Sequence, residues 1–196
     1  MIFLVLGDDK ICRAFVRDNV VPESVKLIRD KSSAGIGRIL RLVRKGVLTP
    51  KQVVQIALAE TSRARAPAYS AEEVSSSNEL LKLVETYSPS KIILFRAGLI
   101  VNGKLLSSGL PIWNLHAAKI PEYGGLASIS RALRDRAFHQ CATLHVVTSR
   151  IDDGEVLDTE PYTLSADRSY AANEAVAYAA GSRLLRRTLD RRLRQS

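Results

Sequence analysis

An amide and an imidazole stand two residues apart at the end of a short apolar segment, residues 112–116. The segment predicts a β-strand, in which side chains at positions i and i+2 leave the same face, so Asn114 and His116 point the same way. A proline and two glycines, ending at Gly125, then interrupt regular structure. An amide and an imidazole at a strand end can stabilise a developing negative charge and exchange a proton. Taken alone, however, such a pair is more often a set of hydrogen-bonded structural groups.

A carboxylate follows the next expected strand, residues 142–148. The loop after that strand, residues 149–157, carries Asp152, Asp153 and Gly154. A carboxylate close to an imidazole favours its charged form and can accept a proton. By itself the loop reads as an ordinary Asp-Asp-Gly turn.

Together these stretches resemble the folate-dependent formyltransferase family. The family signature is Asn-x-His, then three residues, Leu or Ile, Pro, any residue, Tyr or Phe, any residue and Gly, followed by a strand and a loop of the form hydrophobic-Asp-x-Gly. The sequence matches in order, spacing and turn residues. The resemblance implies that Asn114, His116 and Asp152 are catalytic, and it selects Asp152 over Asp153. The match is to the N-terminal catalytic domain of the family; it is closest to the small-molecule and sugar N-formyltransferases and is also similar to methionyl-tRNA formyltransferase and glycinamide ribonucleotide transformylase.

The resemblance also implies the formyl donor, 10-formyltetrahydrofolate. Family members bind the pterin of the donor through backbone groups of a segment that here is similar to residues 96–101. The residues expected to contact the donor are Gly98, Leu99, Ile100, Val101, Arg150 and Ile151. Without the resemblance, residues 96–101 read as a strand that runs into an ordinary turn.

Formyl transfer to an amine needs an oxyanion stabiliser and a route for protons from the amine to the departing folate nitrogen. Asn114 can donate to the oxyanion, and losing such a donor raises the barrier by about 3 kcal/mol. His116, with an ordinary pKa of about 6.5, can share the oxyanion as an imidazolium or relay protons. Asp152 would set the balance between these two roles.

Strands that alternate with helices predict an α/β fold, a Rossmann-like doubly wound and mostly parallel sheet of the formyltransferase type. We expect one catalytic domain, residues 1–196, with a helical insertion at about 34–66, where Thr49, Pro50 and Gln52 form a helix-start signature. Residues 66–77 read as a polar loop, and Asn78 as the cap of the next helix. The C-terminal residues 165–194 read as one or two helices, which Gly181 would separate.

Composition narrows the class of protein further. The apolar start of the chain is too short for a signal peptide, and no apolar run is long enough to cross a membrane. We therefore expect a cytoplasmic protein without a membrane partner, and the resemblance implies that it is a biosynthetic enzyme. The two cysteines lack metal-ligand spacing, so we expect buried free thiols and no metal site.

The net charge is +9. The arginines gather near residues 38–45 and 183–194, without the interleaved aromatics that stack on bases, so we expect solvated helix faces and no nucleic-acid partner. If these arginines bind a ligand, phosphate is the natural candidate. Relative to the family pattern, Lys119 adds a cation near the expected active-site mouth, and Gly124-Gly125 replaces a common Arg-Gly pair.

The leading hypothesis is an N-formyltransferase that moves the formyl group of 10-formyltetrahydrofolate to a primary amine of a small acceptor, such as a nucleotide-linked amino sugar, with or without a phosphate. The first turn, residues 7–10, has one glycine and two carboxylates, so it does not supply the phosphate site of glycinamide ribonucleotide transformylases. The chain also ends too early for the C-terminal barrel of a methionyl-tRNA formyltransferase.

Three alternatives stay open: a 10-formyltetrahydrofolate hydrolase, a methionyl-tRNA formyltransferase-like enzyme, and a nucleic-acid-binding domain that uses the basic C-terminal helix. Whether the protein forms a homodimer is also left open.

Overall fold

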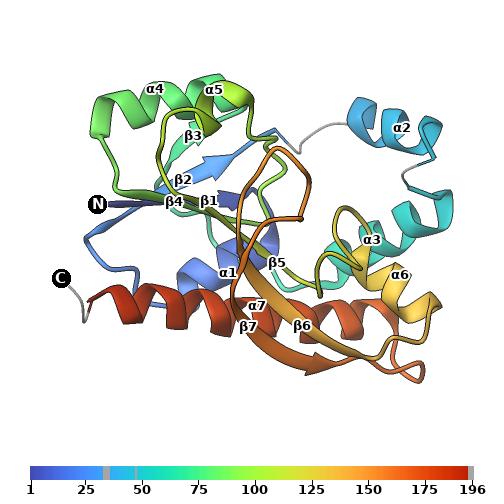
Figure 1. Ribbon diagram of the computed structural model, residues 1–196. Helices are drawn as coiled ribbons and strands as arrows, with labels where there is room; N and C mark the ends of the chain where they lie inside the picture. The colour runs from blue at the N-terminus through green and yellow to red at the C-terminus, as the bar shows by residue number, and fades with distance from the viewer. Residues whose placement is uncertain (33–35, 47, 194–196) are drawn as a thin grey trace.

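A seven-stranded sheet forms the centre of the computed structural model, which describes residues 1–32, 36–46 and 48–193 (Figure 1). The strands lie in the order β3-β2-β1-β4-β5-β6-β7. The first five in this order are parallel, whereas β6 runs antiparallel to both of its neighbours. The strands are β1 (Ile2–Gly7), β2 (Val25–Asp30), β3 (Glu72–Val74), β4 (Lys91–Phe95), β5 (Ile112–His116), β6 (His139–Val146) and β7 (Val156–Thr163).

Helices cover both faces of the sheet (Figure 1). Alternate residues of β1 show the division: Leu4 and Leu6 pack in one apolar cluster, and Phe3 and Val5 pack in the other. The first cluster includes side chains of α1, α6 and α7, and the second includes side chains of α4 and α5. The expected doubly wound, mostly parallel α/β sheet is therefore confirmed. The helices are α1 (Lys10–Asp18), α2 (Ile36–Arg44), α3 (Pro50–Ser62), α4 (Ser77–Tyr87), α5 (Gly103–Leu106), α6 (Ser128–Arg134) and α7 (Tyr170–Leu193).

Two strands lie where the sequence did not predict them. β3 forms inside the expected polar loop 66–77 and pairs with the end of β2. β7 pairs antiparallel with β6 after the Asp152 loop. β3 has only three residues, and most side chains of β7 are at least partly exposed, so neither shows the apolar pattern that identifies a buried strand. The helix start expected at Asn78 was also wrong: Ser76 caps α4 by accepting from the N–H of Glu79.

Helices α2 and α3 lie in the segment where a helical insertion was expected; residues 34, 35 and 47 of that segment lie outside the described part. The capping box at Thr49 and Gln52 is present, with Pro50 in the first turn. α3 packs against α7, and Gln52 approaches Ser130 of α6 at 3.5 Å. Within the described ranges, no helix is long and apolar enough to cross a membrane.

Gly181 does not divide the C-terminal helix, because α7 runs through it without a break. A Cβ at this position would lie 3.2 Å from Leu115 Cδ2 and 3.2 Å from Phe95 Cε2. The missing side chain therefore lets α7 lie close against the middle of the sheet, directly over β4 and β5. The sequence pattern of a helix-breaking glycine was misleading because packing, not a turn, requires this glycine.

Gly181→Leu should lower the free energy of unfolding by about 1–3 kcal/mol, because the new side chain must displace Leu115 and Phe95 from a packed core. Ala179→Leu is the matched control on the same helix: Ala179 is exposed, so its replacement should change stability by less than about 0.5 kcal/mol. Urea unfolding of both variants measures the difference. Equal effects in the two variants would contradict the proposed close approach.

Candidate active site

The C-terminal end of β5 carries Asn114 and His116. β5 lies between parallel β4 and antiparallel β6, and its register places Asn114 opposite His145 and His116 opposite Thr143. Because Asn114 and His116 are two residues apart on a strand, both side chains leave the same face of the sheet. Both residues are partly buried.

Asp152 reaches this pair from the loop after β6. The Asp152 backbone has φ +48°, a left-handed conformation that aspartate adopts more readily than most residues. Two residues later the chain presses on β6: a Cβ at Gly154 would lie only 1.8 Å from the carbonyl oxygen of Val146. The loop is therefore held close to β6 just after Asp152. The Asp152 side chain points back towards Asn114 of β5.

The Asp152 carboxylate has four polar neighbours. Its Oδ1 lies 3.1 Å from Asn114 Nδ2 and 3.3 Å from His145 Nε2. Its Oδ2 accepts from the Gly125 N–H at 2.7 Å and lies 3.2 Å from His116 Nδ1. The structure thus brings together the three side chains that the sequence singled out, and it adds His145 and a backbone amide.

These neighbours decide the ionisation of Asp152. Burial raises the pKa of the carboxyl group, but the hydrogen bond of His145, the charge on His116 and the Gly125 N–H together outweigh burial and hold the pKa well below its usual range. The carboxylate is therefore ionised at neutral pH. Burial likewise lowers the pKa of His116 below 6.5, and the attraction of Asp152 offsets only part of that shift.

The tautomer of His116 follows from its second contact. Nε2 lies 2.9 Å from the carbonyl oxygen of Tyr123, which can only accept, so Nε2 carries the proton. In the neutral ring Nδ1 is then unprotonated and faces Asp152 at 3.2 Å. A proton that arrives at Nδ1 is immediately shared with the carboxylate, so the pair can take up and return one proton.

His145 is a residue of this cluster that the sequence did not reveal. It lies on β6, is buried, and places Nδ1 at 2.9 Å from the carbonyl oxygen of Val146. Its Nε2 lies 3.2 Å from Asn114 Nδ2, so a neutral His145 can accept from the amide, and a protonated one can donate to Asp152. The sequence does show a histidine on the strand before the Asp152 loop. Only the β5–β6 register, however, places His145 opposite Asn114.

The family model described as "Formyl transferase" matches residues 42–188. This chain belongs to the formyl transferase family. Methionyl-tRNA formyltransferase of Staphylococcus epidermidis is 25% identical over 146 residues, which are 74% of this chain and 46% of that protein. The corresponding enzyme of Caldicellulosiruptor saccharolyticus is 24% identical over 169 residues, 85% of this chain and 50% of that protein. The chain spans about half the length of these curated relatives.

Solved structures of similar fold include three kinds of formyl-group enzyme. A phosphoribosylglycinamide formyltransferase from Anaplasma phagocytophilum has a TM-score of 0.63 at 15% identity, covering 92% of this chain and 79% of its own. A sugar N-formyltransferase from a Shewanella species has a TM-score of 0.64 at 16% identity, covering 96% and 68%. A formyltetrahydrofolate deformylase from Pseudomonas syringae has a TM-score of 0.62 at 17% identity, covering 97% and 61%. At these identities the likeness establishes the fold.

The segments expected to bind a folate donor already form hydrogen bonds and ion pairs within the protein. The N–H groups of Gly98 and Leu99 donate to the buried Asp30 carboxylate at 2.6 and 2.8 Å, so a pterin bound here would use other backbone groups of residues 98–101. Ile100 is 74% exposed. Ile151 is also 74% exposed, and Arg150 forms an exposed ion pair with Asp153 at 3.3 Å.

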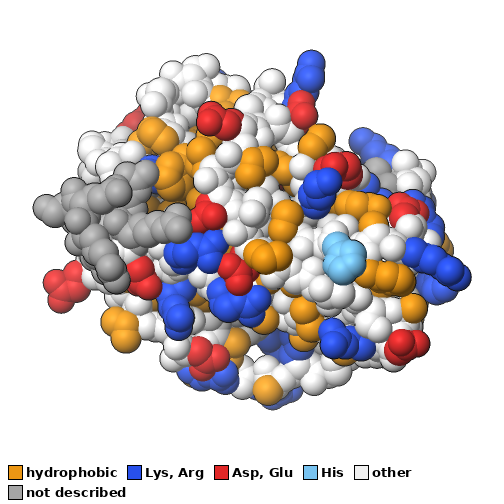
Figure 2. All heavy atoms as spheres, turned by 60° about the horizontal axis from the view of Figure 1, so that its bottom comes forward, with side chains coloured by type: hydrophobic (Ala, Val, Ile, Leu, Met, Phe, Trp, Pro, Cys, Tyr) orange, Lys and Arg blue, Asp and Glu red, His pale blue; other side chains and the backbone are white. Residues whose placement is uncertain are grey.

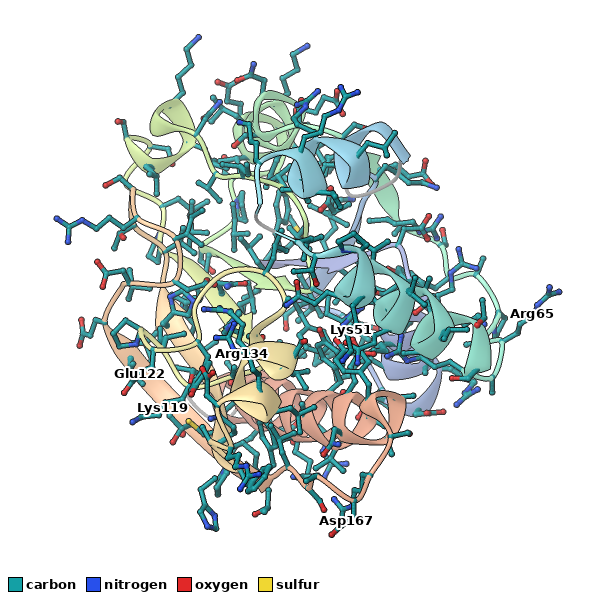
Figure 3. All side chains as sticks on the ribbon, turned by 90° about the vertical axis from the view of Figure 1, so that its right-hand side faces the viewer. Lys51, Arg65, Lys119, Glu122, Arg134 and Asp167 are labelled. Atoms are coloured by element: carbon teal, nitrogen blue, oxygen red, sulfur yellow. The ribbon has the colours of Figure 1, made fainter. Side chains whose placement is uncertain are left out.

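Lys119, expected to add a cation near the mouth of the site, forms an ion pair with Glu122 at 2.7 Å (Figure 3). Both side chains are half exposed, so the pair is close to neutral and solvated. Among the described residues, no group of three or more His, Cys, Asp or Glu side chains is arranged to hold a metal ion.

The first turn of the sheet is closed by carboxylates of the chain itself. Asp9 accepts from the N–H of Cys12 at 2.9 Å, and Glu60 of α3 accepts from the N–H of Lys10 at 3.2 Å. Lys10 Nζ binds the carbonyl oxygens of Glu60, Thr61 and Arg63 at 2.8, 3.3 and 2.9 Å. The N-terminus of α1, where a phosphate could bind, is thus capped by side chains from α3 and from the turn.

We expect NMR titration to give His116 a pKa below 6.5, and we expect that pKa to fall further in Asp152→Asn, because the variant removes the negative charge that favours the imidazolium. His139 serves as an internal control, since it is exposed at the start of β6, and in the described part of the structure it forms no hydrogen bond or ion pair with Asp152. A His116 pKa that rises in Asp152→Asn would show that the two groups do not interact as the structure indicates.

Proposed function

We propose that this protein transfers the formyl group of 10-formyltetrahydrofolate to a primary amine of a small acceptor, such as a nucleotide-linked amino sugar. The observation that carries the proposal is the shared carboxylate: Asp152 lies within 3.2 Å of both Asn114 and His116 at the C-terminal end of β5. Membership of the formyl transferase family supports the reaction class. The exposed Ile100 and Ile151 offer apolar surface on the two segments expected to hold the donor.

The chemistry assigns a step to each side chain. When the amine nitrogen bonds to the formyl carbon, the carbonyl oxygen becomes negative, and Asn114 Nδ2 can donate to it. The amine must then lose a proton, which the His116–Asp152 pair can accept because His116 is neutral and Asp152 is ionised. Breakage of the bond between the formyl carbon and the folate nitrogen needs a proton on that nitrogen, and the same pair returns it.

Carboxylates already occupy the turn between β1 and α1, so we expect an acceptor that places no phosphate there. Glu60 and Asp9 already occupy N–H groups at the start of α1, and both are negative. A ribonucleotide phosphate would have to displace two carboxylates there, and repulsion between the like charges would weaken its binding. We therefore expect glycinamide ribonucleotide to be a poor acceptor.

Hydrolysis of 10-formyltetrahydrofolate is a second candidate reaction. Water can replace the amine in the same arrangement, and a formyltetrahydrofolate deformylase is among the proteins of similar fold. Dependence of tetrahydrofolate release on an added amine separates transfer from hydrolysis. Initiator methionyl-tRNA belongs in the same panel of acceptors, because methionyl-tRNA formyltransferases are relatives in sequence.

The basic C-terminal helix offers little support for a nucleic-acid-binding domain. Arg183 and Arg187 of α7 form ion pairs with Glu160 at 2.8 and 2.6 Å, and Arg187 also pairs with Asp158 at 3.2 Å. On the face shown in Figure 2, blue basic side chains are interspersed with red acidic ones. The phosphate backbone of a nucleic acid would meet acidic as well as basic side chains on this face. The side chains of residues 191–196 lie outside the described part of the structure.

Asp152→Asn should abolish acceptor-dependent release of tetrahydrofolate, because the amide cannot take up a proton. Asp153→Asn is the matched control, since Asp153 is the next residue, is exposed, and pairs only with Arg150 among the described ion pairs. A spectrophotometric assay with a panel of nucleotide-linked amino sugars, amino acids, glycinamide ribonucleotide and initiator methionyl-tRNA measures both variants and names the acceptor. Full activity of Asp152→Asn would refute the catalytic assignment, and release without any acceptor would favour the hydrolase.

Asn114→Ala should lower kcat by about 10²–10³ while the KM for the acceptor changes little, because the amide acts mainly on the charge of the transition state. Steady-state kinetics with the acceptor identified above gives both constants. A rise in KM with unchanged kcat would instead assign Asn114 to ground-state binding.

A further inference from the structure

One peptide group joins Arg131 to the Asp152 carboxylate. Arg131, on α6, donates from Nη2 to the carbonyl oxygen of Gly124. The N–H of the same peptide, which belongs to Gly125, donates to Asp152 Oδ2 at 2.7 Å. A cation therefore binds one end of a peptide dipole and an anion binds the other, and each contact strengthens the other by polarisation.

The peptide lies close against Asp152 at Gly124 and has a backbone conformation at Gly125 that favours glycine. A Cβ at Gly124 would lie 3.0 Å from Asp152 Cβ. Gly125 has φ +78°, a conformation that favours glycine. Any displacement of this peptide would therefore move the carboxylate that it contacts.

The surroundings of Arg131 set it apart from the next arginine of the helix. No carboxylate lies within ion-pair distance of Arg131 in the described part of the chain, and its guanidinium lies 6.0 Å from the ring centroid of Tyr123. Arg134, by contrast, forms an ion pair with Asp135 at 2.8 Å, and its side chain is 71% exposed (Figure 3). The charge of Arg131 is thus directed at the Tyr123–Gly125 turn, whose carbonyl oxygen at Tyr123 also binds His116.

We propose that Arg131 is a positioning residue for formyl transfer: through the Gly124–Gly125 peptide it holds the Asp152 carboxylate in the orientation that faces Asn114 and His116. The inference rests on the proposed function, in which Asp152 takes part in proton transfer. In this role Arg131, on α6, acts on the candidate site through a backbone group, the carbonyl of Gly124.

The proposal predicts the consequences of removing the guanidinium. Arg131→Gln should lower kcat by about tenfold or more, because a misplaced carboxylate transfers protons poorly, and should leave the KM for the acceptor unchanged within about twofold. The pKa of His116 should fall, because a displaced Asp152 carboxylate no longer favours the imidazolium, and this effect is larger than that of the removed Arg131 charge, which by itself would raise the pKa. The acidic limb of the kcat profile should move to lower pH together with that pKa, because His116 must be neutral to take up the proton.

The experiment compares Arg131→Gln, Arg131→Lys and the matched control Arg134→Gln by steady-state kinetics across pH, by NMR titration of His116, and by urea unfolding. Arg134→Gln should resemble the wild type in all three measurements. Arg131→Lys should recover only part of kcat and only part of the His116 pKa, because an ammonium keeps the charge but lacks the planar geometry of the guanidinium.

Two results would overturn the inference while leaving the proposed function intact. One is an Arg131→Gln variant with wild-type kcat, pH profile and His116 titration. The other is a loss of activity that follows the loss of stability alone, with the pH profile and the His116 pKa unmoved in the folded fraction. If Asp152→Asn itself keeps full activity, the proposed function fails first, and the His116 titration alone then tests whether Arg131 acts on the cluster.

Discussion

A largely buried carboxylate shared by several donors is the interaction on which the candidate active site depends. An ionised group removed from water is costly unless hydrogen bonds and opposite charges replace its hydration. Asp152 meets that requirement with groups from three separate segments: β5, the Gly124–Gly125 turn and β6. If any of these segments shifts, a buried charge loses a donor, so the carboxylate holds the segments together as much as they hold it.

The same contacts determine how a proton can move. Because the Tyr123 carbonyl fixes the proton of His116 on Nε2, the nitrogen that exchanges protons is Nδ1, and it faces Asp152. Burial keeps the imidazole neutral, and donors keep the carboxylate charged, so the pair is ready to accept a proton at neutral pH. In an exposed pair of histidine and aspartate, water would form hydrogen bonds with each group separately. The protonation states of the two groups would then not be set by their surroundings in this way.

Much of the fold and part of the site could be read from the sequence, for identifiable reasons. Fully buried strands such as β1 and β4 appear as continuous apolar runs, and the Asn114 and His116 spacing places two polar groups on one face. The polar environment of His145 could not be predicted, because cross-strand register depends on contacts between distant segments and not on local pattern. Edge strands β3 and β7 were missed since they bury little apolar surface, and Gly181 was misread because a close helix approach and a helix end select the same residue.

Charged side chains lie beyond the carboxyl ends of β1 and β4, next to α3 and α7. In doubly wound sheets, ligands bind at the point where the strand order reverses, and here that point lies beyond the ends of these two strands. Arg96, at the end of β4, pairs with Asp9 at 2.5 Å and lies 3.9 Å from the ring centroid of Tyr178 on α7. Arg63, just after α3, pairs with Glu174, which lies on α7 like Tyr178.

Charges of opposite sign from residues next to β1, β4 and α3, and from α7, are therefore already paired in this region. A ligand that binds in this region must replace one of these pairs or lie beside them. The net charge of the chain is thus a poor guide to its acceptor. α3 and the residue after it contribute Glu60 and Arg63 to this region, so we expect substitutions there to alter the charge that a ligand meets.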